Sequence, residues 1–341
     1  MIQVEGLTKY YLGDQPAISN LSFYADRGEI VGFLGPNGAG KTTTMRILTG
    51  YMPASAGKAI VAGYDVMRQS IEVRQRVGYL PETVPLYKDI TVWQYLDYMA
   101  GLHGMTNPDR TDRVEEVLDQ VDMLDRADSL VANISKGMRQ RVGLAQAIVH
   151  NPDVLILDEP MVGLDPDQRR EVRELIQNLG EARTVMLSSH DLAEVEKVCT
   201  RVLVINRGRI VAEDSPEALA NNMQGMQRFY VRVDNDAAGK LKELVMSVEG
   251  VAEAKVDDRK GGLEVIATRD SNARPAVAAL IVSNNLDLLE LRPLDMSLED
   301  IFLQLTAEAE AELADEDEWD DLDDDEFDDL AEDLDEDEET K

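Results

Sequence analysis

The first two thirds of the chain alternate short apolar runs with longer segments of helical periodicity. The runs are rich in Val, Ile and Leu, as is typical of strands that are buried on both faces. Helical patterns such as 167–179 and 191–198 follow them. Strands that alternate with helices predict an α/β fold with a largely parallel sheet. The expected strands are 30–34, 154–157, 184–188 and 202–205, with an antiparallel hairpin over 2–23 in front of them.

A block without strand patterns interrupts this alternation. Residues 91–149 show helical periodicity over 92–102, 110–122 and 136–150. A helical block inside an α/β domain predicts a helical subdomain on one flank of the sheet.

The pattern changes again at about residue 228. Strand-like and helix-like segments follow each other there and predict a small α+β domain with its own core, over 228–305. Gly225 is the expected linker, so the first domain is predicted to span 1–224. The expected strands of the small domain are 229–233, 262–266 and 286–291, and its expected helices are 238–246 and 274–284.

An acidic, low-complexity segment ends the sequence. From Glu308 onward there are 22 acidic residues and a single lysine. Like charges at this density repel one another, and few apolar side chains remain to offset the entropy of ordering, so 306–341 is predicted to be disordered. Two roles are open for this tail. It is either a solvating extension, or it docks to a basic partner with Trp319 and Phe327 as apolar anchors.

Composition excludes several classes of protein. The 341 residues carry a net charge of −33, of which −12 lies before the tail, so no nucleic-acid-binding surface is expected. No segment approaches the roughly 18 apolar residues of a membrane span. Cys199 is the single cysteine, which we expect to be a small buried side chain. Together with the lack of a signal-peptide pattern, it predicts a reducing, cytoplasmic environment.

A glycine-rich motif follows the first expected strand. The segment 35–42 reads GPNGAGKT and matches the P-loop pattern GxxxxGK[ST] between a strand and a helix predicted over 41–49. Backbone N–H groups of such a loop surround phosphates, and the helix N-terminus adds positive potential. Lys41 is expected to reach the β- and γ-phosphates of ATP, and the Thr42 hydroxyl to bind Mg²⁺. The candidate nucleotide-binding residues here are Gly35, Pro36, Asn37, Gly38, Ala39, Gly40, Lys41, Thr42 and Thr43.

Two carboxylates end the second expected strand. Asp158 and Glu159 follow the apolar run 154–157, which is the arrangement of a Walker B motif. A carboxylate at this end of a strand can reach the Mg²⁺ shell, which is the role predicted for Asp158. The neighbouring Glu159 is placed to act as the general base toward water.

With these motifs the sequence resembles ATP-binding subunits of ABC transporters over about 1–224. The resemblance implies a P-loop NTPase cassette with an N-terminal antiparallel β-subdomain and a helical subdomain. It also implies that Tyr11, with Tyr10 as the alternative, stacks on adenine; a tyrosine of the core or of the hairpin is the other interpretation. His190 is implied to contact the γ-phosphate and to help to hold Glu159 and the water. His103 and His150 have no such motif context and are predicted to be structural.

Three further motifs carry the resemblance. The Q-loop falls at 78–82, the signature motif at 134–141 and the D-loop at 163–166. Glu82 is accordingly assigned to the nucleotide and metal sites. Ser135, Gly137 and Asp165 are assigned to the nucleotide site. The resemblance implies that Ser135 and Gly137 reach the γ-phosphate held by a second copy of the chain.

Two positions depart from the family pattern. Glu82 replaces the usual Q-loop glutamine, and its full negative charge would either bind the metal more tightly or repel the γ-phosphate when the metal is absent. Lys136 replaces the first glycine of the signature motif. This variant, SKGMRQ, resembles exporter-type subunits, including those associated with gliding motility.

The resemblance implies an ATPase, ATP + H₂O to ADP + phosphate, that works as a homodimer and powers a separate membrane-spanning permease. The expected system is an exporter with an ABC-2 type permease, and the expected location is the cytoplasmic face of the cell membrane. Trp93 and Tyr95 either contact the permease or belong to the core.

The alternatives to a transporter subunit are a soluble ABC ATPase of translation or DNA repair and an ATP-sensing regulatory subunit. The domain over 228–305 resembles the C-terminal domain of drug- and antibiotic-export ATPases.

Overall fold

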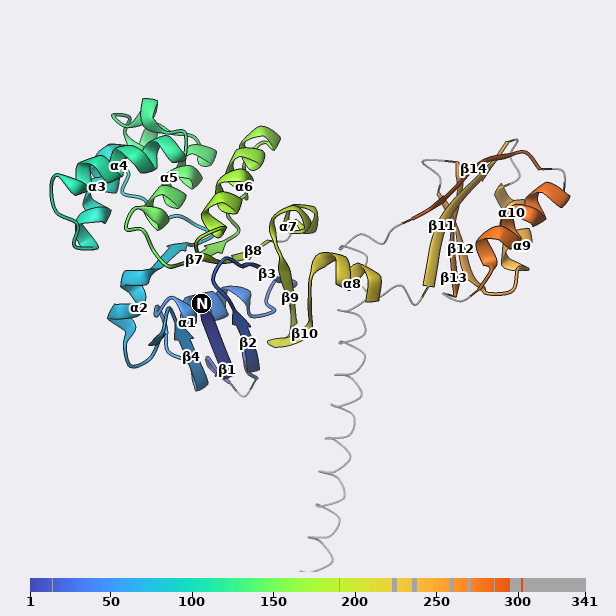
Figure 1. The fold of residues 1–341 in the computed structure, drawn as a ribbon, viewed down its shortest axis with the longest axis horizontal. Helices are drawn as coiled ribbons and strands as arrows, with labels where there is room; N and C mark the ends of the chain where they lie inside the picture. Colours follow the sequence, from blue (N-terminus) through green and yellow to red (C-terminus); the bar gives the residue numbers. More distant parts are fainter. Residues whose placement is uncertain are drawn as a thin grey trace, which may run out of the picture. The chain divides into compact units, whose positions relative to one another are not determined.

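The computed structural model describes residues 1–13, 15–189, 191–222, 226–234, 238–257, 261–268, 271–284, 286–294 and 302. The chain forms two compact units, Met1–Glu213 and Asp214–Ile301, and Phe302 belongs to the first (Figure 1). The predicted domain bounds, 1–224 and 228–305, stay a prediction. The predicted tail, 306–341, and His190 lie outside the described residues.

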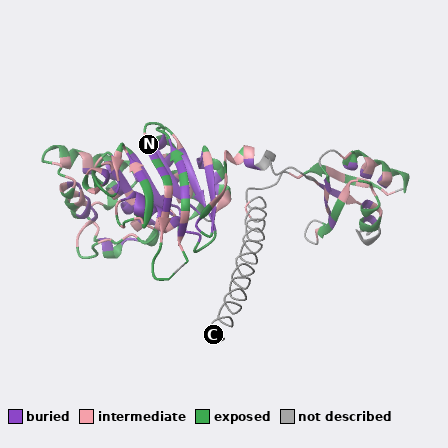
Figure 2. Ribbon diagram, turned by 90° about the horizontal axis from the view of Figure 1, so that it is seen from below, coloured by how far each residue is buried: buried purple, intermediate pink, exposed green. Residues whose placement is uncertain are grey.

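A six-stranded sheet forms the centre of the first unit, as the alternating pattern predicts. Its strand order is β10-β9-β3-β8-β7-β6, and the pairs from β9 to β6 are parallel. Buried residues gather in the strands of this unit (Figure 2), and every residue of β3, β7 and β8 is buried. The strands are β3 (Ile30–Leu34), β6 (Val77–Leu80), β7 (Val154–Asp158), β8 (Thr184–Ser188), β9 (Arg201–Asn206) and β10 (Arg209–Asp214).

A second sheet of the first unit is antiparallel and has the order β2-β1-β4-β5. The predicted N-terminal hairpin is confirmed as β1 (Ile2–Lys9) and β2 (Ile18–Ala25). Burial alternates along both strands, so that one face packs on the core and the other faces solvent. The sequence analysis did not find β4 (Ala56–Val61) and β5 (Tyr64–Asp65), which complete this sheet.

The helical subdomain is also confirmed, as α3 (Val92–Leu102), α4 (Asp109–Gln120) and α5 (Lys136–Ile148). These helices lie at the opposite end of the unit from β1, β2 and β4 (Figure 1). Tyr95 on α3 is 2% exposed and therefore belongs to the core, whereas Trp93 is half-buried. The other helices of this unit are α1 (Lys41–Leu48), α2 (Ser70–Arg76), α6 (Pro166–Gly180) and α7 (Leu192–Val198).

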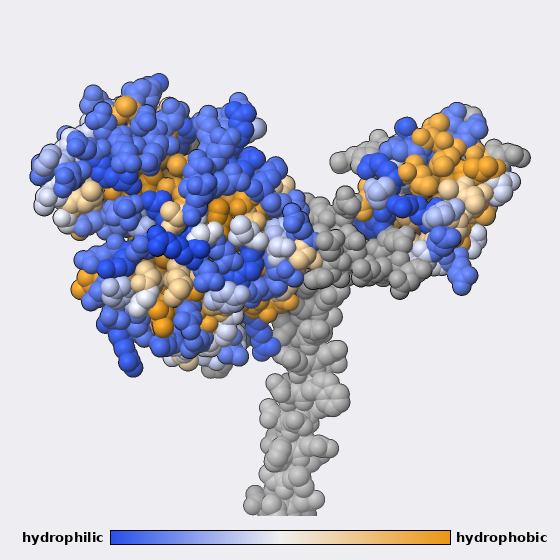
Figure 3. Space-filling model, in the orientation of Figure 1, coloured by the Kyte–Doolittle hydropathy of each residue, from blue (hydrophilic) through white to orange (hydrophobic). Residues whose placement is uncertain are grey.

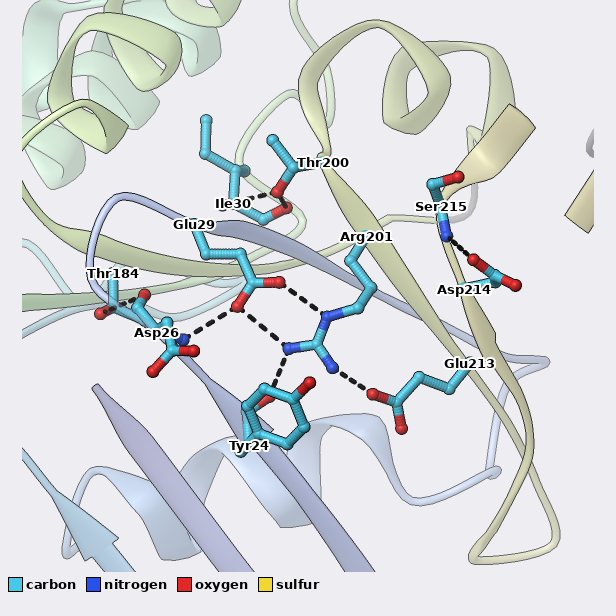
Figure 4. A network of polar contacts seen from close by, with 10 residues as sticks. All are labelled: Tyr24, Asp26, Glu29, Ile30, Thr184, Thr200, Arg201, Glu213, Asp214 and Ser215. Carbon is cyan, nitrogen blue, oxygen red and sulfur yellow. Dashed lines mark hydrogen bonds and ion pairs between the residues drawn. The ribbon is translucent and has the colours of Figure 1, made fainter. Parts of the chain in front are cut away.

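Arg201 joins the two sheets of the first unit (Figure 4). Its guanidinium donates to both carboxylate oxygens of Glu29, at 2.7 and 3.0 Å, and to the backbone oxygen of Tyr24 on β2. It also pairs with Glu213 on β10. Burial alone lowers the pKa of Arg201, but the bonds to these two carboxylates raise it above its usual value. A planar group that makes several charge-assisted bonds fixes the relative position of the sheets.

The second unit contains α8 (Pro216–Asn222) and a βαββαβ fold whose sheet has the order β12-β13-β11-β14. This order of antiparallel strands is that of ferredoxin-like domains. Apolar residues of the two helices in this fold, 238–246 and 273–283, pack on one face of the sheet and form a separate core. Hydrophobic surface also gathers on this unit in Figure 3, and Val282 and Leu289 are exposed there. Its elements are β11 (Met226–Val233), α9 (Ala238–Met246), β12 (Val251–Asp257), β13 (Gly262–Thr268), α10 (Ala273–Ser283) and β14 (Leu288–Pro293).

The structure also bears on two smaller predictions, those of the buried cysteine and of the membrane span. Cys199 is buried, and burial raises the pKa of its thiol, as expected of an inert core cysteine. In the part of the chain that the structure describes, no helix combines the length and the apolar composition needed to cross a membrane.

Candidate functional site

The glycine-rich motif connects β3 to α1 in a tight turn. A Cβ on Gly35 would lie 2.4 Å from the backbone oxygen of Ile205, so this position has no room for a side chain. Gly40, which precedes α1, has a φ of +106°, and a Cβ there would lie 2.7 Å from the oxygen of Ala17. The loop is therefore held close to neighbouring backbone, and its curvature depends on glycine.

Lys41 begins α1 and folds back over this loop. Its Nζ donates to the backbone oxygens of Gly35 at 2.6 Å and Pro36 at 3.0 Å, and the residue is 9% exposed. Burial lowers the pKa of the Lys41 ammonium, while the nearby charges of Glu159, Asp158 and Glu82 act to raise it. A cation thus lies in the loop with carboxylates around it.

Asp158 ends β7 and is 2% exposed. Its Oδ2 accepts a hydrogen bond from Thr42 Oγ1 at 3.0 Å, and its Oδ1 accepts one from Ser188 Oγ at 2.6 Å. The buried carboxylate is therefore fixed on both sides. A threonine hydroxyl beside a carboxylate is a set of hard oxygen donors that fits Mg²⁺. Ser188 ends the predicted strand 184–188, but no feature of its sequence context indicated this contact.

Glu159 follows directly and has a left-handed backbone, with a φ of +53°. For a residue with a side chain this conformation costs about 1–2 kcal/mol, so other contacts must hold it. The Glu159 N–H donates to Ser188 Oγ at 3.1 Å. Its carbonyl oxygen accepts from Val162 N at 3.2 Å and from Gln140 Nε2 at 3.3 Å.

These groups surround one cavity of about 410 Å³. Predicted site residues from the glycine-rich motif, the end of β7 and the loop after β6 meet there, and they come from three segments far apart in the sequence. Ala17 and Val162 also line the cavity, although nothing in their sequence context marks them. The lining residues are Ala17, Asn37, Gly38, Gly40, Lys41, Thr42, Thr43, Glu82, Asp158, Glu159 and Val162.

Tyr11 does not line this cavity but lies close to it. Its hydroxyl is 3.2 Å from Thr43 Oγ1, its ring is 5.6 Å from Lys9 Nζ, and the residue is 53% exposed. Tyr10, the alternative, is also exposed, and its backbone N–H donates to Ser55. Of the two tyrosines, Tyr11 is therefore the one whose hydroxyl contacts a residue of the cavity lining.

The predicted signature and D-loop residues lie together outside this cavity. Ser135 caps α5 by accepting from Met138 N, and Asp165 caps α6 by accepting from Gln168 N at 2.9 Å. A Cβ on Gly137 would lie 2.6 Å from Gln168 Oε1, so the two helix starts are in close contact. Ser135 and Asp165 are exposed, and neither they nor Gly137 line the cavity of their own chain.

His103 and His150 form a stacked pair, with ring centres 3.7 Å apart and planes 6° from parallel. His150 Nε2 lies 3.1 Å from the carbonyl oxygen of Val77, so this nitrogen carries the proton. The other nitrogen, Nδ1, is buried and has no hydrogen-bond partner among the described residues. If His150 Nδ1 also bound a proton, the resulting N–H would have no hydrogen-bond acceptor among the described residues. Burial and the neighbouring His103 lower the pKa of His150 to about 4.

This pair predicts a pH dependence of stability. Between pH 6.5 and about 4 the unfolded chain binds a proton at residue 150 that the folded chain does not. The contribution of neutral His150 is therefore fully present above pH 6.5 and is lost as the pH falls toward 4. From pH 7 to pH 4, the free energy of unfolding should fall by roughly 1–3 kcal/mol more in the parent than in His150→Gln. Urea unfolding at both pH values measures this, and equal losses would contradict it.

Known proteins with similar sequences are ATP-binding proteins of transporters. A sequence profile of the family described as "ABC transporter" matches residues 18–162. The linearmycin resistance ATP-binding protein LnrL of Bacillus subtilis is 30% identical over 307 residues, which cover 90% of this chain and 98% of LnrL. The Nod factor export ATP-binding protein I of Cupriavidus metallidurans is 33% identical, and the match covers 90% of this chain and 97% of that protein.

Solved structures give the same result. One described as the ATP-binding subunit of an ABC transporter is 30% identical, with a TM-score of 0.61 over 65% of this chain and 92% of that one. A dimeric cassette in a post-hydrolysis state with ADP and Pi is 22% identical and shares the fold, with a TM-score of 0.59 over 63% of this chain and 98% of that one. The predicted fold class is thus confirmed, and the transporter reading is favoured over the soluble and sensing alternatives. The chain belongs to the ATP-binding proteins of ABC transporters and is an ATP-hydrolysing subunit of this family.

Proposed function

We propose that this subunit powers an exporter, as a homodimer on an ABC-2 type permease at the cytoplasmic face of the cell membrane. The observation that carries the proposal is the cavity in which Lys41, Thr42, Asp158 and Glu159 meet. The names of two relatives, one for Nod factor export and one for linearmycin resistance, support the direction of transport. The cargo is read by the permease rather than by this chain.

ATP binds with its phosphates in the turn between β3 and α1. The backbone of the glycine-rich motif offers N–H groups there, and Lys41 supplies the positive charge. In the free chain the Lys41 ammonium donates to two loop carbonyls, which keeps it at the site before nucleotide arrives. The adenine stacks on Tyr11, at the edge marked by Thr43.

Mg²⁺ is held by Thr42, Asp158 and Glu82. When bound, the ion neutralises charge on the β- and γ-phosphates and orients them. Asp158 is already fixed by Thr42 and Ser188, so its carboxylate needs little rearrangement to act as a ligand. Glu82 is exposed at the cavity wall and adds a full negative charge where the family pattern has an amide. We expect this to strengthen metal binding.

Glu159 takes the proton of the attacking water as general base. It lines the cavity next to Asp158, and its strained backbone is held by hydrogen bonds on both sides. His190, which lies outside the described residues, is assigned to the γ-phosphate and to the water by family resemblance.

Ser135, Gly137 and Asp165 act in the site of the other subunit. Ser135 and Asp165 are exposed, and none of the three lines the cavity of its own chain, which supports this assignment. Nucleotide then lies between two chains and joins them. Hydrolysis removes part of that contact, and the dimer opens. The side chains offered to the permease are the exposed Tyr98 on α3 and the exposed Tyr87 just before the helical subdomain.

Copurification and phosphate release test this function. The tagged full chain, isolated from detergent-solubilised membranes, should bring down a multispanning protein. The reconstituted complex should release phosphate from ATP with Mg²⁺ but not with EDTA. Deletion of the gene should deplete a compound from the medium and raise its level in the cells. A complex that releases no phosphate would contradict the enzyme, and loss of uptake instead of secretion would contradict the exporter.

A further inference from the structure

Gln140 is a buried polar side chain for which the site described above has no role. It lies on α5 and is 6% exposed. Its Nε2 donates at 3.3 Å to the backbone oxygen of Glu159, which follows β7 and lies outside the helical subdomain. A buried amide is costly unless it is hydrogen-bonded, so this contact defines the orientation of the side chain.

The acceptor of this bond belongs to a residue with a left-handed backbone. Glu159 has a φ of +53°, and the direction of its side chain depends on that conformation. On the N-terminal side its N–H is held by Ser188. On the C-terminal side its carbonyl is held by Val162 of the same loop and by Gln140. Of these three contacts, only that of Gln140 comes from the helical subdomain.

A chain of hydrogen bonds connects α5 to α1 through the site. Gln140 on α5 bonds to Glu159, Glu159 to Ser188, Ser188 to Asp158, and Asp158 to Thr42 on α1. Every link is a hydrogen bond of 3.3 Å or less. Glu159 is the first link in this chain, so a shift of α5 would act on it directly and would reach Thr42 only through Ser188 and Asp158.

Close packing holds α5 in place on both sides of Gln140, at Gly137 and at Gly143. A Cβ on Gly137 would lie 2.6 Å from Gln168, so the first turn of α5 rests on the start of α6. A Cβ on Gly143 would lie 2.7 Å from Leu80 and Val84, on either side of Glu82 in the sequence. The helix that carries the signature motif thus touches the loops of Glu82 and Glu159 together.

We propose that Gln140 is a positioning residue for hydrolysis: its amide holds the Glu159 backbone, so that the base is aligned only when α5 is seated. This inference rests on the proposed role of Glu159. Gln140 itself does not touch the nucleotide. A role in filling space is the alternative, and it makes a different prediction, because Met and Glu have nearly the same volume as Gln.

The test compares three variants of the full chain at pH 8. Gln140→Met keeps the shape and removes the donor. Gln140→Glu also keeps the shape and sets a carboxylate against the Glu159 carbonyl. The control is Gln177→Met on α6, where another glutamine donates to a backbone oxygen, that of Lys197 at 2.8 Å, and does not line the cavity. Measurements are kcat and KM for phosphate release, Kd for ATP, and Tm.

Gln140→Met should lower kcat by about tenfold to hundredfold, as expected for a misplaced base, with the Kd for ATP within about twofold of the parent. Gln140→Glu should be slower still, and Gln177→Met should match the parent. The proposal is overturned if Gln140→Met keeps a kcat within about twofold, or if its Kd for ATP rises as far as its kcat falls. A parent protein without Mg²⁺-dependent phosphate release would instead overturn the proposed function, and this inference with it.

Discussion

The Glu159→Gln variant is expected to bind ATP with the affinity of the parent and to hydrolyse it at least about 10²-fold more slowly, since a positioned general base contributes roughly 10²–10⁴-fold. Gln keeps the shape of Glu and can still hydrogen-bond to water, but it cannot accept a proton at neutral pH. Phosphate release under multiple turnover and ATP binding by calorimetry separate the two quantities.

The same variant should also trap the assembled state. Because cleavage is what opens the dimer, a subunit that binds ATP without cleaving it should remain paired. Light scattering of Glu159→Gln with ATP should give twice the monomer mass, and with ADP the monomer mass. Glu174→Gln on α6 is the matched control, because Glu174 is exposed and its ion pair with Arg170 is a loose one of 3.9 Å. A strictly monomeric Glu159→Gln protein in ATP, even with its permease, would contradict the shared site.

The residues with the most demanding local chemistry were the easiest to predict. Lys41 and Thr42 stand in a spacing that few other sites use, and Asp158 and Glu159 follow an apolar run that is typical of a buried strand. The motif order along the chain then predicted which of these residues meet. The strands of the central sheet were predictable for the same reason, because burial on both faces leaves a continuous apolar run.

Other parts of the molecule leave no such pattern. In β12 only Ala254 is deeply buried among exposed charged side chains, so its alternation is too weak to predict a strand. Ser188 and Gln140 act through hydrogen bonds to residues 30 and 19 positions away. Serine and glutamine are frequent at the surface, and nothing local distinguishes a buried contact from a solvated one. Such support for a site becomes visible only when the fold brings its partners together.

The carboxylates around Lys41 explain why this side chain has the second largest expected effect. The free site holds three acidic groups, Glu82, Asp158 and Glu159, next to the place where a polyanion must bind. Lys41 is the cation that lines the cavity among them. Without it, the phosphates would face uncompensated negative charge in a partly buried site, where Coulomb interactions are stronger than in water.

Lys41→Met, which keeps the aliphatic stem and removes the charge, should therefore weaken ATP binding by about 10²-fold or more, the loss of one to two charge-assisted hydrogen bonds. Calorimetric titration with ATP at two salt concentrations measures this, and the variant should show a smaller salt dependence than the parent. Lys58→Met, an exposed lysine on β4, is the matched control and should bind like the parent. If Lys41→Met bound ATP within about threefold of the parent, the phosphates would have to lie elsewhere than in the turn between β3 and α1, and Asp158 and Glu159 would lose their assigned roles with it.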